Sequence, residues 1–278
     1  MDQAEISDET LIYKYVPAKR AMSCLPEIGD GALRATQPSA MNDPFECSFS
    51  KVFKEKDKQE GNMRFAEVLT QIQPDSPIVA DDIEAARQKY GSLYIGELYR
   101  QQLSTRFGII SFSTDPFHPL LWAHYTLDGS GFAIGYKAAE IKRRFEEKAQ
   151  LKRVCYISNP GVISDYIPLS WPESNLINAM QHKSNIWEYE SECRLIIELH
   201  QTLGTGETDH HGQPVNLLRI PNEAVGSIYY TERTPTDSVK EIDRRLKVQN
   251  NRYGVRNATK LVLADNEYRY KEAGQDEI

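Results

Sequence analysis

The sequence predicts an α+β fold, with a central, mostly antiparallel sheet and flanking helices. Segments with the apolar patterns of strands outnumber the short helical segments. The two kinds of segment do not alternate regularly, as they would in a doubly wound parallel sheet. With 278 residues, of which 40% are apolar, the chain can bury a substantial core. It has no internal repeat and no clear linker, so we predict a single domain over residues 1–278.

The expected elements follow in order along the chain. A strand is expected at 11–15 and a helix at about 18–27, followed by a turn, a short strand and a loop. Apolar spacing after the acidic pair Asp81 and Asp82 predicts the longest helical region, and we treat residues 51–106 as a helical insertion. Further strands are expected at 107–114, 131–136, 153–158, 192–200, 215–220, 225–231 and 259–264, with helices after 115, from 137, at 174–183 and at 237–251.

Charge and the first residues bound the class of protein. The formal net charge of -7 argues against a generic polyanion binder, so no nonspecific nucleic-acid coat is expected. The opening "MDQAEISDET" lacks the basic and apolar regions of a secretory signal, which predicts a cytoplasmic protein. No apolar run approaches the roughly 18 residues that cross a bilayer, so membrane insertion is not expected.

Metal and phosphate-loop signals are weak. The four cysteines lie far apart and form no C-x-x-C pair, so neither a zinc ribbon nor a disulfide scaffold is indicated. His210 and His211 lie in a polar stretch without a matching cysteine or acidic cluster. The glycines of "GDGALRA" and "DGSGFAIG" lack the spacing of a phosphate loop. We therefore predict no metal site.

Three carboxylates fall within five positions in "SNIWEYESECRLII". If this run is extended, side chains at alternate positions share one face, so Glu188, Glu190 and Glu192 align with Arg194 while the other face is apolar. Like charges held together repel and raise one another's pKa, so a merely solvated strand would more often mix the signs. The pattern predicts a chemical role for this face. The alternative is a solvated face whose glutamates pair with lysines.

Five spaced motifs carry a resemblance. They are Tyr13-Lys14-Tyr15, the run 42–46 ("NDPFE"), the run 111–114 ("SFST"), the run 122–125 ("WAHY") and the run 183–194, which holds Lys183, Trp187, Glu190, Glu192 and Arg194. The set resembles a widespread bacterial domain family of unknown function, marked by Y-K-Y, N-D-P-F-E, S-F-S, W-x-H-Y and K-x-x-x-W-x-x-E-x-E-x-R. The match spans most of residues 11–230.

The order of the motifs also resembles, more remotely, the mono-ADP-ribosyltransferases. These enzymes share a basic or aromatic motif on an early strand, a central S-x-S strand and a late E-x-E strand. The resemblance implies an ADP-ribosyltransferase-like core that uses NAD as its substrate. This chain departs from one class of these enzymes on the first strand, where Lys14 and Tyr15 replace the expected arginine.

The acidic residues suit the chemistry that this resemblance implies. Cleavage between nicotinamide and ribose passes through an oxocarbenium-like cation, which a nearby carboxylate stabilises. We expect Glu192 to take this role and Glu190 to orient or deprotonate an acceptor. Arg194 would hold the carboxylates ionised or contact a phosphate.

The aromatic helix motif offers two further candidates. His124 would donate to a diphosphate or carry a proton, and Tyr125 would stack on nicotinamide. The competing interpretation places both among core aromatic residues. Lys14 and Tyr15 would contact the cofactor from the first strand.

Short polar side chains complete the expected site. Asn42 and Asp43 precede Pro44 and favour a structural turn, although such residues in a rigid loop also suit a ribose or adenine edge. Ser111 and Ser113 alternate on a strand, so their hydroxyls share one face and bind either ribose or the sheet itself.

The leading hypothesis is an NAD-using protein that transfers ADP-ribose to a macromolecule or hydrolyses NAD, as a bacterial toxin or phage-defence effector. The alternative is a non-catalytic module that recognises a basic protein partner through an acidic cleft. A third possibility is a different nucleotide-processing hydrolase. The most informative structural observation would be whether residues 42, 43, 113, 124, 190 and 192, which are scattered along the chain, converge around one pocket.

Overall fold

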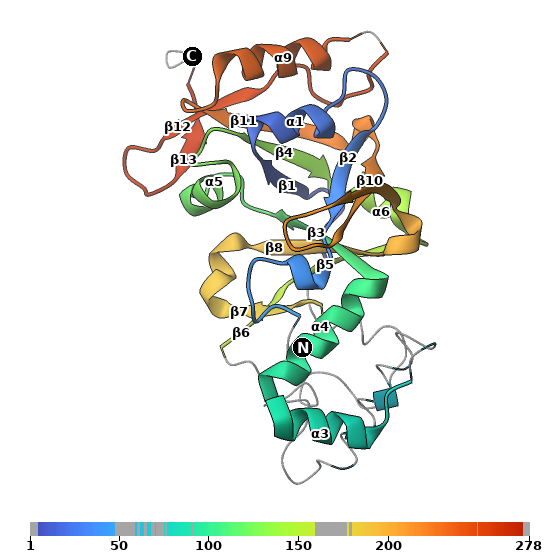
Figure 1. Ribbon diagram of the computed structural model, residues 1–278. Coiled ribbons are helices and arrows are strands. Elements are labelled where there is room, and N and C mark those ends of the chain that lie inside the picture. The colour runs from blue at the N-terminus through green and yellow to red at the C-terminus, as the bar shows by residue number, and fades with distance from the viewer. Residues whose placement is uncertain are drawn as a thin grey trace.

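The computed structural model describes residues 5–47, 77–90, 92–158, 180–248 and 250–274, and residues 59, 62, 63, 66, 67, 70, 75 and 177. Within these residues the fold is α+β, as predicted, and its main element is an eight-stranded, mostly antiparallel sheet (Figure 1). The strand order is β13-β12-β11-β4-β1-β3-β8-β5. Strands β11 and β12 run parallel, and the other neighbours are antiparallel.

The strands of the main sheet are β1 (Leu11–Val16), β3 (Phe107–Ser113), β4 (Phe132–Lys137), β5 (Ala149–Arg153), β8 (Glu192–Glu198), β11 (Val225–Thr231), β12 (Thr259–Leu263) and β13 (Tyr270–Glu272). Six of them agree closely with expected segments. Strands β5 and β13 were not expected, and β5 begins where the helix predicted from 137 was expected to end.

Two smaller sheets lie beside the main one. In the first, β10 (Pro214–Ile220) pairs with β2 (Gly31–Ala35) and with β9 (Leu203–Thr208), and a bridge between Thr36 and Ile109 joins this sheet to β3. In the second, β6 (Cys155–Ile157) runs parallel to β7 (His182–Ser184). Strand β7 replaces the end of the helix expected at 174–183, most of which lies outside the described residues.

Helices cover both faces of the main sheet. Helices α1 (Ala18–Cys24) and α9 (Thr236–Leu246) pack on the face that carries Ile12 and Val16 of β1. On the opposite face, Leu121 and Trp122 of α5 (Pro119–Tyr125) pack against Tyr13 and Tyr15. Helix α6 (Ala138–Phe145) follows β4 and packs against it and β5. Successive side chains of a strand point to opposite faces, and β1 has apolar or aromatic residues on both faces. The strand is therefore buried on both sides.

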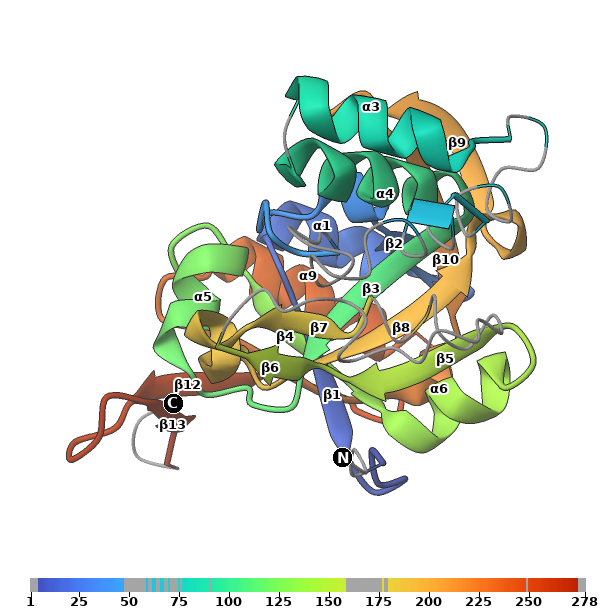
Figure 2. The same ribbon diagram turned by 90° about the horizontal axis from the view of Figure 1, so that it is seen from below.

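Helices α3 (Ala80–Tyr90) and α4 (Ser92–Arg106) lie against each other and extend away from the main sheet (Figures 1 and 2). They occupy the second half of the predicted helical insertion at 51–106. Residues 51–58 of that prediction lie outside the described residues, and residues 59–76 are described only at isolated positions. No helix in the described ranges is both long enough and apolar enough to cross a membrane.

The extended run expected through Glu188 and Glu190 is wrong. Residues Asn185–Glu190 form a 3-10 helix, η3, and strand β8 begins only at Glu192. Between them Ser191 has φ 45°, in the left-handed region, and its N–H donates to the carbonyl of Glu188 at 3.1 Å. This turn breaks the alternation, so Glu188 is exposed while Glu190 is buried. Three further 3-10 helices are η1 (Pro38–Ala40), η4 (Leu199–Gln201) and η5 (Asn222–Ala224).

Gly135 of β4 marks a close approach between strands. A Cβ atom at this position would lie 2.3 Å from Ser227 Oγ and 2.8 Å from Tyr13 Cε1. We therefore expect Gly135→Ala to lower the free energy of unfolding by about 1–3 kcal/mol, measured by urea denaturation. Gly204→Ala is the matched control, because the nearest atom to its Cβ, Asn216 Oδ1, is 3.8 Å away. An equal decrease in the free energy of unfolding in the two variants would contradict the close approach at Gly135.

The hairpin between β9 and β10 carries a second test. Asp209 forms an ion pair with Arg34 of β2 and accepts hydrogen bonds from the N–H groups of His211 at 2.8 Å and Gln213 at 2.9 Å. Burial alone would raise the pKa of Asp209, but the Arg34 guanidinium and the two backbone donors lower it to about 2.

Asp209→Asn is expected to cost about 1–2 kcal/mol of stability at neutral pH, through loss of the charged hydrogen bond. Because the folded-state pKa lies below the unfolded value of roughly 3.9, this stabilisation is complete well above that value and is lost as the pH falls through about 2. Unfolding curves of both proteins across this pH range check the prediction, and a difference that stays constant down to about pH 2 would count against it.

Candidate functional site

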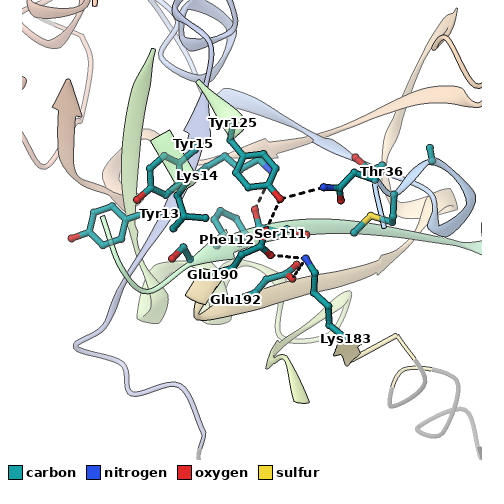
Figure 3. A pocket seen from close by; sticks show the side chains of 15 residues that line it. Tyr13, Lys14, Tyr15, Thr36, Ser111, Phe112, Tyr125, Lys183, Glu190 and Glu192 are labelled. Atoms are coloured by element: carbon teal, nitrogen blue, oxygen red, sulfur yellow. Dashed lines mark hydrogen bonds and ion pairs between the residues drawn. The ribbon is translucent and has the colours of Figure 1, made fainter. Parts of the chain in front are cut away.

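The described part of the chain encloses a pocket between β1 and the β3–β8 pair (Figure 3). The volume of the cavity is ≈ 230 Å³, and the space including open solvent at the mouth is ≈ 750 Å³. Segments far apart in the sequence line it, namely residues 13–15 of β1, Thr36, residues 40–42, residues 111–113 of β3, Leu121, Tyr125, Lys183, Glu190 and Glu192.

The pocket lies where two strands of the sheet diverge. Strands β1 and β3 are joined through the pair Tyr13–Ser113, whereas β3 and β8 pair along their length from Phe107–Glu198 to Ser113–Glu192. Next to the divergence, Lys14 Nζ donates to the backbone carbonyl of Ser111 at 2.9 Å. The local loss of strand pairing therefore creates space in the sheet, and a long side chain satisfies the exposed carbonyl.

One face of the β3–β8 pair is polar. Ser113 lies opposite Glu192 and Ser111 lies opposite Arg194, and side chains opposite each other share a face. The alternate residues of both strands belong to the apolar core on the other side. The prediction that the two serines share a face is confirmed, as is the prediction of a charged face for the strand portion of the acidic run.

Five buried charges form a connected cluster that includes part of the pocket wall and extends behind it. Lys183 Nζ lies 2.5 Å from Glu190 Oε2, 2.9 Å from Glu192 Oε2 and 3.6 Å from Glu46 Oε1. Arg194 Nε lies 2.9 Å from Glu192 Oε1, and the same guanidinium pairs with Glu46. All five side chains are at most 5% exposed. Each charge is thus compensated by partners from a different segment, as a buried ion must be.

The pKa values of Glu192 and Lys183 are shifted within the cluster. Burial raises the pKa of Glu192, against the lowering effect of Lys183 and of the hydrogen bond from Ser111. Burial alone would lower the pKa of Lys183, but the carboxylates of Glu192 and Glu190 raise it above its ordinary value. Lys183 is therefore held as an ammonium ion among the carboxylates.

Tyr125 links the cluster to the pocket mouth. Its hydroxyl donates to Glu190 Oε1 at 2.6 Å and accepts from Asn42 Nδ2 at 3.4 Å. Burial and the Glu190 carboxylate raise the pKa of Tyr125, so the phenol keeps its proton and acts as a donor. This side chain is held by its hydroxyl at the pocket wall.

Arg100 of α4 holds the loop that forms the mouth. Its buried guanidinium donates to five backbone carbonyls, those of Pro38, Ser39, Met41, Asp43 and Pro44, at 2.8–3.4 Å. These contacts satisfy carbonyls that a tight loop leaves unpaired. They fix the position of Asn42 and of the following Glu46.

Eight of the eleven proposed site residues line this pocket: Lys14, Tyr15, Asn42, Ser111, Ser113, Tyr125, Glu190 and Glu192. Some of them also have structural partners. The Tyr15 hydroxyl donates to the carbonyl of Asp115 at 2.6 Å, and Ser113 Oγ accepts from the N–H of Asp115 at 2.9 Å.

Asp43, His124 and Arg194 lie outside the lining. Asp43 is buried and its Oδ1 accepts from the N–H of Phe45 at 2.9 Å, which is the turn role that its place before Pro44 favours. Arg194 is fully buried behind Glu192. His124 is exposed, because Trp122 of the same short helix takes the core position. The geometry thus assigns these three residues to the surroundings of the pocket.

Three residues of the site were not among the expected site residues: Lys183, Glu46 and Arg100. Lys183 and Glu46 belong to the motifs K-x-x-x-W and N-D-P-F-E, so a search for partners of the two glutamates could have found them. Arg100 lies in a helix without a distinctive motif, and the sequence carries no signal for its contacts. In the described ranges, no group of three or more His, Cys, Asp or Glu side chains is placed to hold a metal ion.

Comparison with protein families relates part of the chain to an uncharacterised family. A family model described as "Protein of unknown function (DUF2971)" matches residues 121–195. This range runs from α5 to β8 and contains Tyr125, Lys183, Glu190, Glu192 and Arg194. Over this range the chain is similar to that uncharacterised family, in line with the first resemblance. No curated protein and no solved structure matches the chain.

Lys183→Met is expected to lower the free energy of unfolding by about 3–5 kcal/mol, because Glu190 and Glu192 lose their shared cation. The loss should shrink as the pH falls, since protonation removes the uncompensated charge and Glu192 already has a raised pKa. Chemical denaturation at several pH values measures both effects. Lys240→Met, at an exposed position of α9, is the control and should have little effect. A loss that is independent of pH would refute the electrostatic explanation.

Proposed function

We propose that this pocket binds NAD and promotes cleavage of the bond between nicotinamide and ribose, with ADP-ribose passing to a macromolecular acceptor or to water. The observation that supports the proposal is the meeting of Glu190 and Glu192 with Lys14, Ser111 and Tyr125 in one pocket. By analogy with the mono-ADP-ribosyltransferases, such an enzyme would serve as a bacterial toxin or a phage-defence effector.

The required chemistry is stabilisation of positive charge on the ribose ring. A carboxylate fixed close to the ring stabilises an oxocarbenium-like transition state more strongly than it stabilises neutral substrate. We assign this role to Glu190 in place of Glu192. Each oxygen of Glu190 accepts one hydrogen bond, from Tyr125 or from Lys183, which leaves acceptor capacity for a ribose hydroxyl.

Glu192 is bound more completely. Its oxygens accept from Lys183 at 2.9 Å and from Arg194 at 2.9 and 3.1 Å, and Ser111 adds a further hydrogen bond. Glu192 therefore acts as the shared anion that positions Lys183, and through it Glu190.

The remaining polar groups suit a nucleotide. Tyr125 fixes Glu190 and presents its ring to the pocket, and the exposed Asn42 offers an amide at the mouth. Lys14 adds a basic group from β1. The alternative of a binding module needs an excess of negative charge to recognise a basic partner. Glu190 and Glu192 of the pocket lining already share Lys183 as a counter-ion, so they do not offer unpaired negative charge to such a partner.

Nicotinamide release from NAD by the purified protein tests the proposal. Glu190→Gln is expected to reduce the rate about 10²–10³-fold, because the amide keeps the size and shape of the side chain but not its negative charge. Glu188→Gln, on the exposed side of the same 3-10 helix, should leave the rate unchanged. Thermal melting shows whether both variants fold. If the wild type releases no nicotinamide and NAD does not raise its Tm, the proposal fails.

A further inference from the structure

Two lysines line the pocket and have opposite surroundings. Lys183 pairs with the carboxylates of Glu46, Glu190 and Glu192. Within the described ranges Lys14 forms no ion pair, and its amine donates to a neutral acceptor, the backbone carbonyl of Ser111, at 2.9 Å. The Lys183 amine is therefore held by negative charges, and the Lys14 amine is held by a single dipole at the wall of the same pocket.

The groups around Lys14 come from three elements. Cys24 and Arg20 face it from α1, Glu190 from η3 and Glu192 from β8. Burial is the largest influence and lowers the pKa of the Lys14 amine, and Arg20 lowers it further. Cys24, Glu192 and Glu190 act in the opposite direction without reversing the shift. A lower pKa increases the fraction of amine that is uncharged at any given pH, and the uncharged amine is the nucleophile.

When the surroundings shift the pKa values of two like groups in one pocket in opposite directions, the two groups have different chemical roles. Lys183 remains an ammonium ion that organises the carboxylates. Lys14 is free to react with an electrophile that enters the pocket. The electrophile expected there is the product of NAD hydrolysis, because the open-chain form of ADP-ribose carries an aldehyde at C1 of the ribose.

We propose that Lys14 is a covalent attachment site, whose amine condenses with the C1 aldehyde of ADP-ribose held in the pocket to form an imine. This inference rests on the proposed function for the source of the aldehyde. The nitrogen lone pair attacks the carbonyl carbon, and a proton passes from nitrogen to the oxygen. The hydroxyl of the carbinolamine then leaves as water while the C=N bond forms. Amine and aldehyde give imine and water, with no change of oxidation state.

Reductive trapping tests the inference on the full chain. The protein is incubated with ADP-ribose and sodium cyanoborohydride, which reduces an imine to a stable secondary amine, and is then digested for mass spectrometry. We expect one adduct, on the peptide that contains Lys14. Lys14→Arg should abolish the adduct, because a guanidinium is not nucleophilic. Lys19→Arg, at an exposed position of α1, should leave it unchanged.

An adduct spread over surface lysines, or one that persists in folded Lys14→Arg, would overturn the inference. If Lys14→Arg does not fold, the wild type is methylated with formaldehyde and cyanoborohydride at increasing pH. Lys14 should then react at a lower pH than Lys19 and before Lys183, and the reverse order would overturn the inference.

Because ADP-ribose is supplied directly, this result is independent of NAD cleavage. Nicotinamide release without an adduct at Lys14 would leave the proposed function in place and remove the inference. An adduct without nicotinamide release would remove the proposed function and retain Lys14 as an aldehyde-reactive group.

Discussion

The buried ion cluster constrains the rest of the pocket. Glu46, Lys183, Glu190, Glu192 and Arg194 are each removed from water, which costs several kcal/mol per ion unless a partner is present. None of them can be placed independently of the others. The cluster therefore requires four segments to meet at one point: the loop at residues 41–46, strand β7, the 3-10 helix η3 and strand β8. This requirement explains why motifs separated by more than a hundred positions in the sequence converge.

The α+β class and six of the eight strands of the main sheet could be predicted from the sequence, because apolar patterning is a local property of each strand. The short strands β5 and β13 lack such a pattern and were not predicted. The 3-10 helix at Asn185–Glu190 could not, since it depends on the left-handed φ of Ser191 and on tertiary contacts of Glu190. Eight of the proposed site residues line the pocket. They could be proposed because the motifs hold polar side chains within otherwise apolar elements. The role of Arg100 could not be predicted because all its acceptors are backbone carbonyls, which every residue has.

The proposed roles depend on counting hydrogen bonds, which only the structure allows. Glu190 and Glu192 are equivalent in the sequence pattern. In the structure, hydrogen bonds from Arg194 and Ser111 use the acceptor sites of the Glu192 carboxylate, whereas the Glu190 carboxylate can still accept a hydrogen bond from a ligand. The same comparison separates Lys183, surrounded by carboxylates, from Lys14, which lies against a backbone carbonyl. In each pair the two side chains are chemically identical but have different surroundings. One of them, Glu192 or Lys183, holds the site together, and the other, Glu190 or Lys14, is available to react.

The contacts of Arg100 have a mechanical consequence. A planar guanidinium donates in fixed directions, so its five carbonyl partners form a rigid joint between α4 and the loop that carries Asn42. Helix α4 also packs against α3, outside the main sheet. The position of this helical pair and the position of the pocket rim are therefore mechanically coupled through one side chain, Arg100, which is not itself among the residues that line the pocket.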